Sequence, residues 1–219
     1  MAGRTPGGAR DAHRREARRR RRDRHVLGEG SGRLAVVPPA TDVWETIAGE
    51  ATRESDLWAS ALLARGEREP VAVFSPLADP RFALGLETIY EGYLLHYGRP
   101  RLFRPPDRDT SILLGDYLYA HGLVRIAEHG EVAVVADLAE LLSLCAQLRA
   151  QAAPGRPVSD GVVWAATVSL LGGVDARLAR AREALRDEGA AAPLESLAAD
   201  VAGGEPLRIA LGLHAARTA

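Results

Sequence analysis

Two glutamates, Glu87 and Glu91, have the type and spacing best suited to chemistry in this sequence. They lie four positions apart, so an α-helix would place both carboxylates on one face. Such a pair can bind a divalent cation together with phosphate oxygens, because Mg²⁺ prefers carboxylate and substrate oxygens as ligands. It can also contact a partner protein, or face the solvent on the polar side of an amphipathic helix. The residues alone leave these interpretations open.

Other side chains with catalytic or metal-binding potential lack the necessary spacing. The six histidines show neither an HxxxH nor an HExxH pattern, and His121 and His129, eight positions apart, are expected to have packing or surface roles. The one cysteine, Cys145, lies in an apolar run and is predicted to be a small buried residue. The chain contains no glycine-rich phosphate loop and no nucleophile elbow. We therefore assign no catalytic residue.

The composition and periodicity predict an all-α fold. Hydrophobic residues make up 47% of the 219 residues, and alternating β-branched runs are scarce. Proline, glycine and capping residues divide the chain into helices expected near residues 42–64, 80–97, 107–128, 131–152, 160–171, 175–187, 193–202 and 206–216. The expected architecture is a helical bundle of seven or eight helices that occupies residues 38–219.

Residues 1–37 are predicted to be a disordered, arginine-rich tail. Residues 1–25 hold ten arginines against three acidic residues, which gives this segment a net charge of +7 and leaves −8 on the rest of the chain. A solvated tail, or a start site assigned too far upstream, is the expected explanation. The alternative is electrostatic binding of nucleic acid or of an acidic partner. Nucleic acid is the less favoured ligand, because no aromatic residue interrupts the run Arg18–Arg22.

The chain carries no signal for a membrane or for secretion. No window of 18 uncharged apolar residues is present, and no apolar core follows the basic N-terminus. A single cysteine excludes an intrachain disulfide framework. We therefore expect a cytoplasmic protein without a membrane span.

Residues 111–120, with the sequence SILLGDYLYA, carry a family resemblance. They resemble the helix of trans-polyprenyl diphosphate synthases, of the class I isoprenoid synthase fold, that reads roughly aiLxGDxLxxxA. In that family the glycine of an RRGxP turn precedes this Gly-Asp pair by seventeen residues. Gly98 precedes Gly115 by the same seventeen residues, and Pro100 matches the proline of the turn. The resemblance covers roughly residues 40–172 and implies a truncated isoprenoid synthase fold.

The resemblance also implies roles for particular side chains. The family binds Mg²⁺ through two aspartate-rich motifs; the metals hold an allylic diphosphate and stabilise the departing pyrophosphate. Counting back from Gly98 places Glu87 and Glu91 at the first and last positions of the first DDxxD motif, while Thr88 replaces its second carboxylate. The two arginines of the turn are replaced, and Arg99 and Arg101 are the nearest substitutes for binding diphosphate. The second aspartate-rich motif is missing near residues 187–217.

Asp116 and the tyrosines of the two matched helices have more than one interpretation. Asp116 lies in an otherwise apolar helix, where a structural hydrogen bond is expected rather than catalysis. The tyrosines can line a prenyl pocket, but aromatic residues at helical spacing are more often part of a core. They are Tyr90, Tyr93, Tyr97, Tyr117 and Tyr119.

The resemblance, combined with the altered metal motifs, leads to one main functional hypothesis. It is a non-catalytic polyprenyl synthetase-like protein, without a resident cofactor, that serves as an accessory or regulatory subunit of a catalytic polyprenyl diphosphate synthase or associates with itself. One alternative is an atypical Mg²⁺-dependent prenyltransferase that uses Glu87 and Glu91. Another is a helical scaffold whose arginine-rich tail binds an acidic partner.

Overall fold

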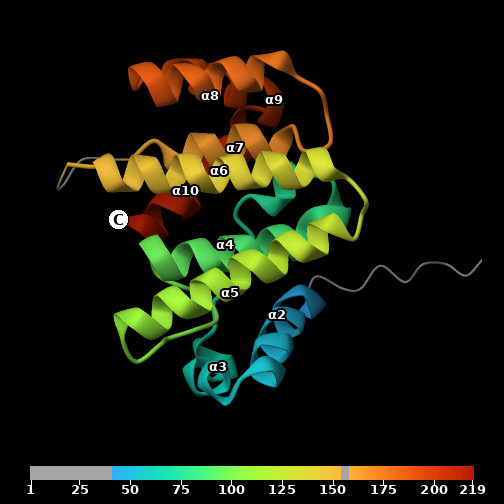
Figure 1. The fold of residues 1–219 in the computed structure, drawn as a ribbon, viewed down its shortest axis with the longest axis vertical. Helices are drawn as coiled ribbons and strands as arrows, with labels where there is room; N and C mark the ends of the chain where they lie inside the picture. The colour runs from blue at the N-terminus through green and yellow to red at the C-terminus, as the bar shows by residue number, and fades with distance from the viewer. Residues whose placement is uncertain (1–40, 154–157) are drawn as a thin grey trace, which may run out of the picture. The chain divides into compact units, whose positions relative to one another are not determined.

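The structure, a computed structural model, describes residues 41–153 and 158–219 and shows helices throughout (Figure 1). The nine α-helices of these residues are α2 (Thr41–Glu54), α3 (Asp56–Ala61), α4 (Ala83–Tyr97), α5 (Arg108–Ala127), α6 (Val132–Gln151), α7 (Asp160–Ser169), α8 (Ala176–Glu188), α9 (Ala192–Ala202) and α10 (Gly204–Thr218). No β-strand occurs in the described residues, which contain only an isolated bridge between Leu62 and Phe103. The predicted all-α bundle is confirmed, and the predicted tail at residues 1–37 lies outside the described residues.

The single helix predicted over residues 42–64 is wrong, because Ser55 divides it into α2 and α3. Ser55 has an extended backbone (φ −156°, ψ 138°), and its hydroxyl accepts a hydrogen bond of 3.1 Å from the Leu57 N–H. Serine is a strong N-cap residue because its side chain satisfies a backbone N–H that the first turn leaves free. The continuous apolar periodicity of this stretch hid the break.

Helix α4 is the centre of the bundle. A 3₁₀ turn, Pro80–Phe82, leads into it, and the Asp79 carboxylate caps that turn by accepting from the Arg81 N–H at 3.0 Å. All residues from 85 to 95 are buried, whichever face of the helix they occupy. Any polar side chain in this stretch must therefore find its partner inside the protein.

Two pairs of glycines bring α4 and α5 into direct backbone contact. Gly85 lies against Gly122, and Gly92 lies against Gly115, so the two helices run antiparallel (Figure 1). A Cβ atom at Gly122 would lie 2.9 Å from the carbonyl oxygen of Gly85, and one at Gly92 would lie 2.8 Å from that of Gly115. Gly115, the glycine of the Gly-Asp pair, is thus required by close helix packing.

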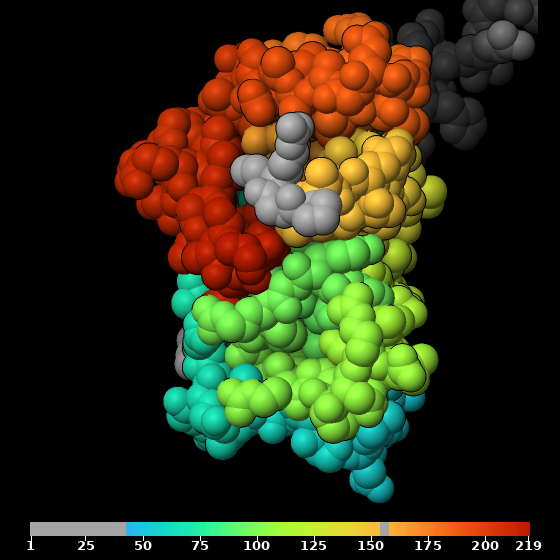
Figure 2. All heavy atoms as spheres, turned by 90° about the vertical axis from the view of Figure 1, so that its left-hand side faces the viewer, coloured from blue at the N-terminus to red at the C-terminus, as the bar shows by residue number. Residues whose placement is uncertain are grey.

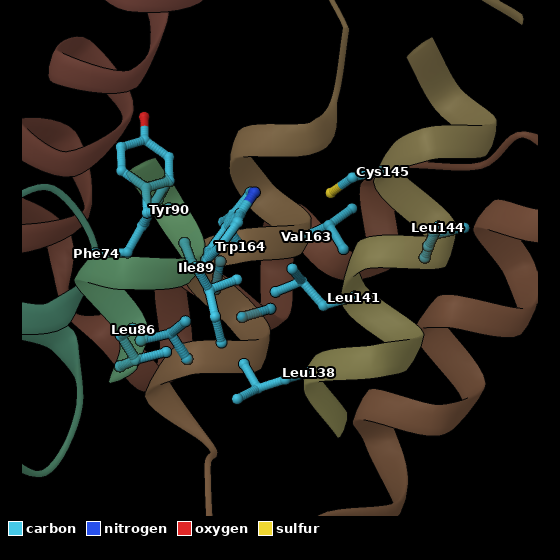
Figure 3. Packing of buried hydrophobic residues seen from close by; sticks show 14 of the residues in the cluster. Phe74, Leu86, Ile89, Tyr90, Leu138, Leu141, Leu144, Cys145, Val163 and Trp164 are labelled. Carbon is cyan, nitrogen blue, oxygen red and sulfur yellow. The ribbon is translucent and has the colours of Figure 1, made fainter. Parts of the chain in front are cut away.

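The apolar side chains form two cores. The larger lies among α4, α6, α7, α8, α9 and α10; in it Leu138, Leu141 and Cys145 of α6 approach Val163 and Trp164 of α7 (Figure 3). Burial of Cys145 confirms its prediction as a core residue. In the smaller core, α2 and α3 pack against α4 and α5.

The C-terminal helix closes onto the loop that follows α4. The Arg99 N–H donates to the carbonyl of Arg217 at 2.8 Å, and α10 also packs against α7 and α9. Helix α8 ends at Glu188 and is capped by Gly189, whose φ of 69° is the left-handed conformation that favours glycine at a helix C-terminus. Among the helices in the described part of the chain, none has the length and apolar character needed to cross a membrane.

Candidate functional site

Glu87 and Glu91 lie in the interior of the bundle and surround a buried arginine. Their exposed fractions are 2% and 0%, and that of Arg101 is 0%. The interpretation of the two glutamates as solvent-facing acids is therefore wrong. The cause is the position of α4, which neighbouring elements cover on every side.

All four carboxylate oxygens of this pair accept hydrogen bonds. The Arg101 guanidinium donates to Oε2 of Glu91 at 2.9 Å and to Oε2 of Glu87. Oε1 of Glu91 accepts from the backbone N–H groups of Arg101 and Leu102, at 2.9 and 2.7 Å. Oε1 of Glu87 accepts from the hydroxyl of Ser75. The two acids are thus fully satisfied by groups of the same chain.

Arg101 is equally well satisfied. It donates to the carbonyls of Val71 at 3.0 Å and of Glu87 at 3.1 Å. Its guanidinium carbon lies 4.6 Å from the ring centre of Trp44 and 5.0 Å from that of Tyr90, within the range of cation–π attraction. Burial by itself would lower the pKa of Arg101. The charges and hydrogen bonds of Glu87 and Glu91 have the larger effect, so the pKa of Arg101 is raised. The side chain is therefore a permanent buried cation.

This geometry is poorly suited to the magnesium ion that the family resemblance implies. A cation bound by Glu87 and Glu91 would have to displace the guanidinium that already lies between them. In the part of the chain that the structure describes, no three histidine, cysteine or acidic side chains converge on a common metal position. A metal role for the two glutamates stays a prediction that requires Arg101 to move away.

The structure separates the two arginines predicted to bind substrate. Arg101 is enclosed, whereas the Arg99 side chain is 58% exposed and pairs with Glu69 at the surface. Arg99 lines a surface pocket of about 290 Å³ together with Arg104, which pairs with Glu67 at 3.2 Å. Each arginine therefore already has an acidic partner, and of the two predicted substrate-binding arginines only Arg99 is placed to reach a ligand in solution.

A second buried polar centre surrounds Asp160, the first residue of α7, which is 1% exposed. Oδ2 of Asp160 accepts from Nε of Arg149 at 2.7 Å and from the hydroxyl of Tyr93. Oδ1 lies 3.1 Å from Nε2 of His214 and accepts from the Gly161 N–H at 3.0 Å. Helices α4, α6, α7 and α10 thus meet at one carboxylate.

The centre continues from His214 to Tyr90, whose hydroxyl lies 3.0 Å from Nδ1 of the imidazole. Burial raises the pKa of Tyr90 and of Tyr93, so both hydroxyls keep their protons. Burial by itself would raise the pKa of Asp160, whereas its partners lower it. Hydrogen bonds from His214 and Tyr93, with the charge of Arg149, outweigh burial and hold the pKa of Asp160 below its ordinary value.

Aromatic rings fill the space between these two polar centres. Tyr90 lies 5.2 Å from Trp164 and 5.3 Å from Phe74 in edge-to-face contacts, and Phe74 stacks on Trp164 at 5.4 Å, measured between ring centres. Figure 3 shows Phe74, Tyr90 and Trp164 grouped where α4 approaches α7. Tyr90 and Tyr93 are therefore core residues, as helical spacing favoured, and do not line an open prenyl pocket.

The sequence pointed only in part to the second centre. A helix was predicted to begin at residue 160, and helical spacing favoured Tyr93 as a core residue, but His214 was not singled out. One available signal was the helix Asp160–Ser169, whose only charged residue is its first. Asp116, for which a structural hydrogen bond was expected, has an exposed side chain, and its Oδ1 lies 3.2 Å from Nε2 of His96.

Comparisons with known proteins give no further assignment: no protein-family model, curated protein or solved structure matches the chain.

Proposed function

We propose that this protein is a non-catalytic, isoprenoid-synthase-like subunit that binds a catalytic polyprenyl diphosphate synthase in the cytoplasm and modulates it. The observation that carries the proposal is the internal neutralisation of Glu87 and Glu91 by Arg101. Glu87 and Glu91 occupy the positions that correspond to metal ligands in the family that the sequence resembles. In this chain they stabilise the fold, and the partner would supply the chemistry.

The aromatic core supports the same proposal. A prenyltransferase must hold an extended apolar chain beside its metal site, which requires an apolar cavity. In this bundle the space between α4 and α7 holds Phe74, Tyr90, Tyr93 and Trp164, each at most 1% exposed. The packed rings occupy the space that a prenyl chain would need. Helix α4 therefore serves helix packing in this proposal, as an accessory subunit requires.

The test is a reconstitution with a purified polyprenyl diphosphate synthase from the same organism. Turnover of farnesyl diphosphate with isopentenyl diphosphate in Mg²⁺ is measured for each protein alone and for the mixture, and binding is measured by calorimetry. We expect no turnover by this chain alone, direct binding to the synthase, and a changed rate or product length in the mixture.

Two results would contradict the proposal. Mg²⁺-dependent turnover by the isolated chain, lost in Glu91→Gln but kept in the matched surface variant Glu67→Gln, would favour the atypical prenyltransferase. Absence of binding to any polyprenyl diphosphate synthase of the organism would remove the accessory role. The remaining alternative, an acidic partner held by the arginine-rich tail, concerns residues outside those the structure describes.

A further inference from the structure

Helices α8 and α9 line a pocket of about 350 Å³. The two helices pack against each other at one end of the bundle, as Figures 1 and 2 show. Ala181 and Leu197, each 4% exposed, form the floor of the pocket, and the ring of Pro193 adds an apolar wall. The volume lies within the range of about 300–1,000 Å³ that is usual for small-molecule sites.

The pocket forms because each helix turns one face toward the other. Near the start of α8, the Arg177 guanidinium donates at 3.0 Å to Asp200, near the end of α9, so the two helices run antiparallel. The α8 residues that line the pocket follow helical spacing, which places them on one face: Arg177, Arg180 and Ala181. The α9 residues that line it do the same: Pro193, Ser196, Leu197 and Asp200.

One of the two arginines in the pocket is neutralised by neighbouring acids. Nε and Nη2 of Arg177 donate to the two carboxylate oxygens of Asp175, at 3.1 and 2.8 Å, and Nη1 donates to Asp200. Arg180 is also close to Asp175, since its charge helps to lower the pKa of that carboxyl. The hydrogen bonds of Asp175, however, go to Arg177.

Arg180 and Ser196 have polar groups that remain available to a ligand. Both residues are exposed, and within the residues that the structure describes neither the Arg180 guanidinium nor the Ser196 hydroxyl forms a hydrogen bond or an ion pair. Two guanidinium groups and one carboxylate line the pocket, so its net charge is +1. An open cation and an open hydroxyl therefore lie beside an apolar floor.

The pocket that Arg99 lines shows that this surplus charge is specific to the α8–α9 pocket. There Arg99 pairs with Glu69, and Arg104 pairs with Glu67 at 3.2 Å. Two arginines and two glutamates line that pocket, so their charges cancel. It offers no spare cation, although its volume of about 290 Å³ is similar.

We propose that the α8–α9 pocket binds a small carboxylic acid with an apolar body. The planar guanidinium of Arg180 matches the two oxygens of a carboxylate, and the Ser196 hydroxyl can donate to one of them. The apolar body of the ligand covers Leu197, Ala181 and the ring of Pro193. A carboxylate carries one negative charge, which balances the net charge of the pocket, whereas a phosphate monoester carries about two.

The test is a titration of the full chain with benzoate and with hexanoate, and it does not involve the proposed synthase partner. We expect saturable binding by calorimetry with a Kd below about 10 mM. In NMR spectra of the ¹⁵N-labelled protein, the backbone amide signals of Ser196 and Leu197 should shift. Benzylamine, which has the same ring and a positive charge, should not bind, and phenyl phosphate should bind more weakly than benzoate.

Substitutions on the pocket wall assign the binding to Arg180. Because this side chain is exposed, Arg180→Gln should keep the fold, which circular dichroism checks. It should weaken benzoate binding at least about tenfold, and Ser196→Ala should weaken it about threefold. Arg180→Lys should restore part of the affinity, because it returns the charge without the planar fork. Arg104→Gln, in the pocket whose charges cancel, is the matched control and should leave the affinity unchanged.

Four results would overturn the proposal. They are the absence of saturable benzoate and hexanoate binding below about 10 mM, wild-type affinity in Arg180→Gln, amide shifts confined to residues outside α8 and α9, and binding of benzylamine as tight as that of benzoate. Tighter binding of phenyl phosphate than of benzoate would replace the carboxylic acid with a phosphate ester as the ligand class.

Discussion

The two buried polar centres of this bundle are built in opposite ways. At the first, one cation is held by two acids: Arg101 lies between Glu87 and Glu91, which are 14 and 10 residues away in the sequence. At the second, one acid is held by several partners. Asp160 contacts His214, which is 54 residues away in the sequence, and accepts hydrogen bonds from Tyr93 of α4 and Arg149 of α6. The acidic partners of the first centre thus come from nearby in the sequence, whereas the second centre also needs a partner from the C-terminal helix.

The centres also differ in their contact with solvent and in how they can respond to pH. Arg101 is fully enclosed and always charged, whereas Arg149, the cation of the second centre, keeps 16% of its side chain exposed. Asp160 is an acid whose pKa is held below its ordinary value by its hydrogen-bond partners and by the charge of Arg149. The comparison indicates that the first centre fixes the position of α4, while the second joins four helices through a titratable carboxylate.

The largest expected effect comes from removing the cation of the first centre. In Arg101→Met two buried carboxylates lose their partner, which we expect to lower the free energy of unfolding by about 4 kcal/mol. This loss in the free energy of unfolding is measured by urea denaturation, monitored by circular dichroism. Arg99→Met, at the exposed neighbour, is the control and should cost less than about 1 kcal/mol. Equal losses in the two variants would show that the burial of Arg101 contributes nothing.

A smaller loss is expected when the acid of the second centre is neutralised. Asp160→Asn keeps the shape and an acceptor oxygen but leaves Arg149 without its charge partner, at a cost of about 2–3 kcal/mol. Because Arg149 can reach water, we expect the loss to be smaller than in Arg101→Met. If Asp160→Asn proved the more damaging of the two, the ranking of the centres by enclosure would be wrong.

The pH dependence of stability should separate the two centres. The pKa of Asp160 is lowered in the folded state, so its stabilising effect is present above the unfolded pKa of about 3.9 and is lost as pH falls through the folded value. The difference in unfolding free energy between wild type and Asp160→Asn should therefore shrink below about pH 4. Urea titrations from pH 7 to pH 3 test this; a difference that stays constant over that range would refute it.

The smallest expected effect is at the edge of the second centre. Tyr90→Phe removes the hydroxyl beside Nδ1 of His214 while preserving the aromatic packing, and we expect a loss of about 1 kcal/mol. Tyr117→Phe, at a half-buried tyrosine on α5, serves as the matched control and should change stability by less than about 0.5 kcal/mol. A loss as large as that of Asp160→Asn would mean that the hydroxyl, and not the carboxylate, dominates the centre.

Local signals in the sequence predicted most of the helices but misjudged one boundary. Asp79 with Pro80, and the glycine and prolines after Tyr97, marked the limits of α4 because capping and helix termination depend on adjacent residues. Ser55 was missed because its cap lies within a run that keeps helical periodicity. A strong periodic signal thus masked a local one.

The roles of Glu87 and Glu91 were beyond the reach of the sequence. Helical spacing showed that they share a face, but an exposed face and an interior one carry the same spacing. Only the fold showed that α4 is covered on all sides and that Arg101 lies between the two acids. A family resemblance suggested metal ligands at these positions, whereas the packing supplied a guanidinium.

The sequence by itself determined the all-α class, the limits of most helices and the pairing of two acids on α4, because these properties depend on residues within a few turns of one another. The tertiary structure alone decided which acids are buried, which cations neutralise them and that His214 meets Asp160. Burial and long-range pairing depend on how helices pack, and packing brings together residues that no local pattern connects. The small apolar residues on the outer sides of α5 and α6, such as Ala120 and Ala136, belong to both levels: they are visible in the sequence, but only the fold shows that they are exposed.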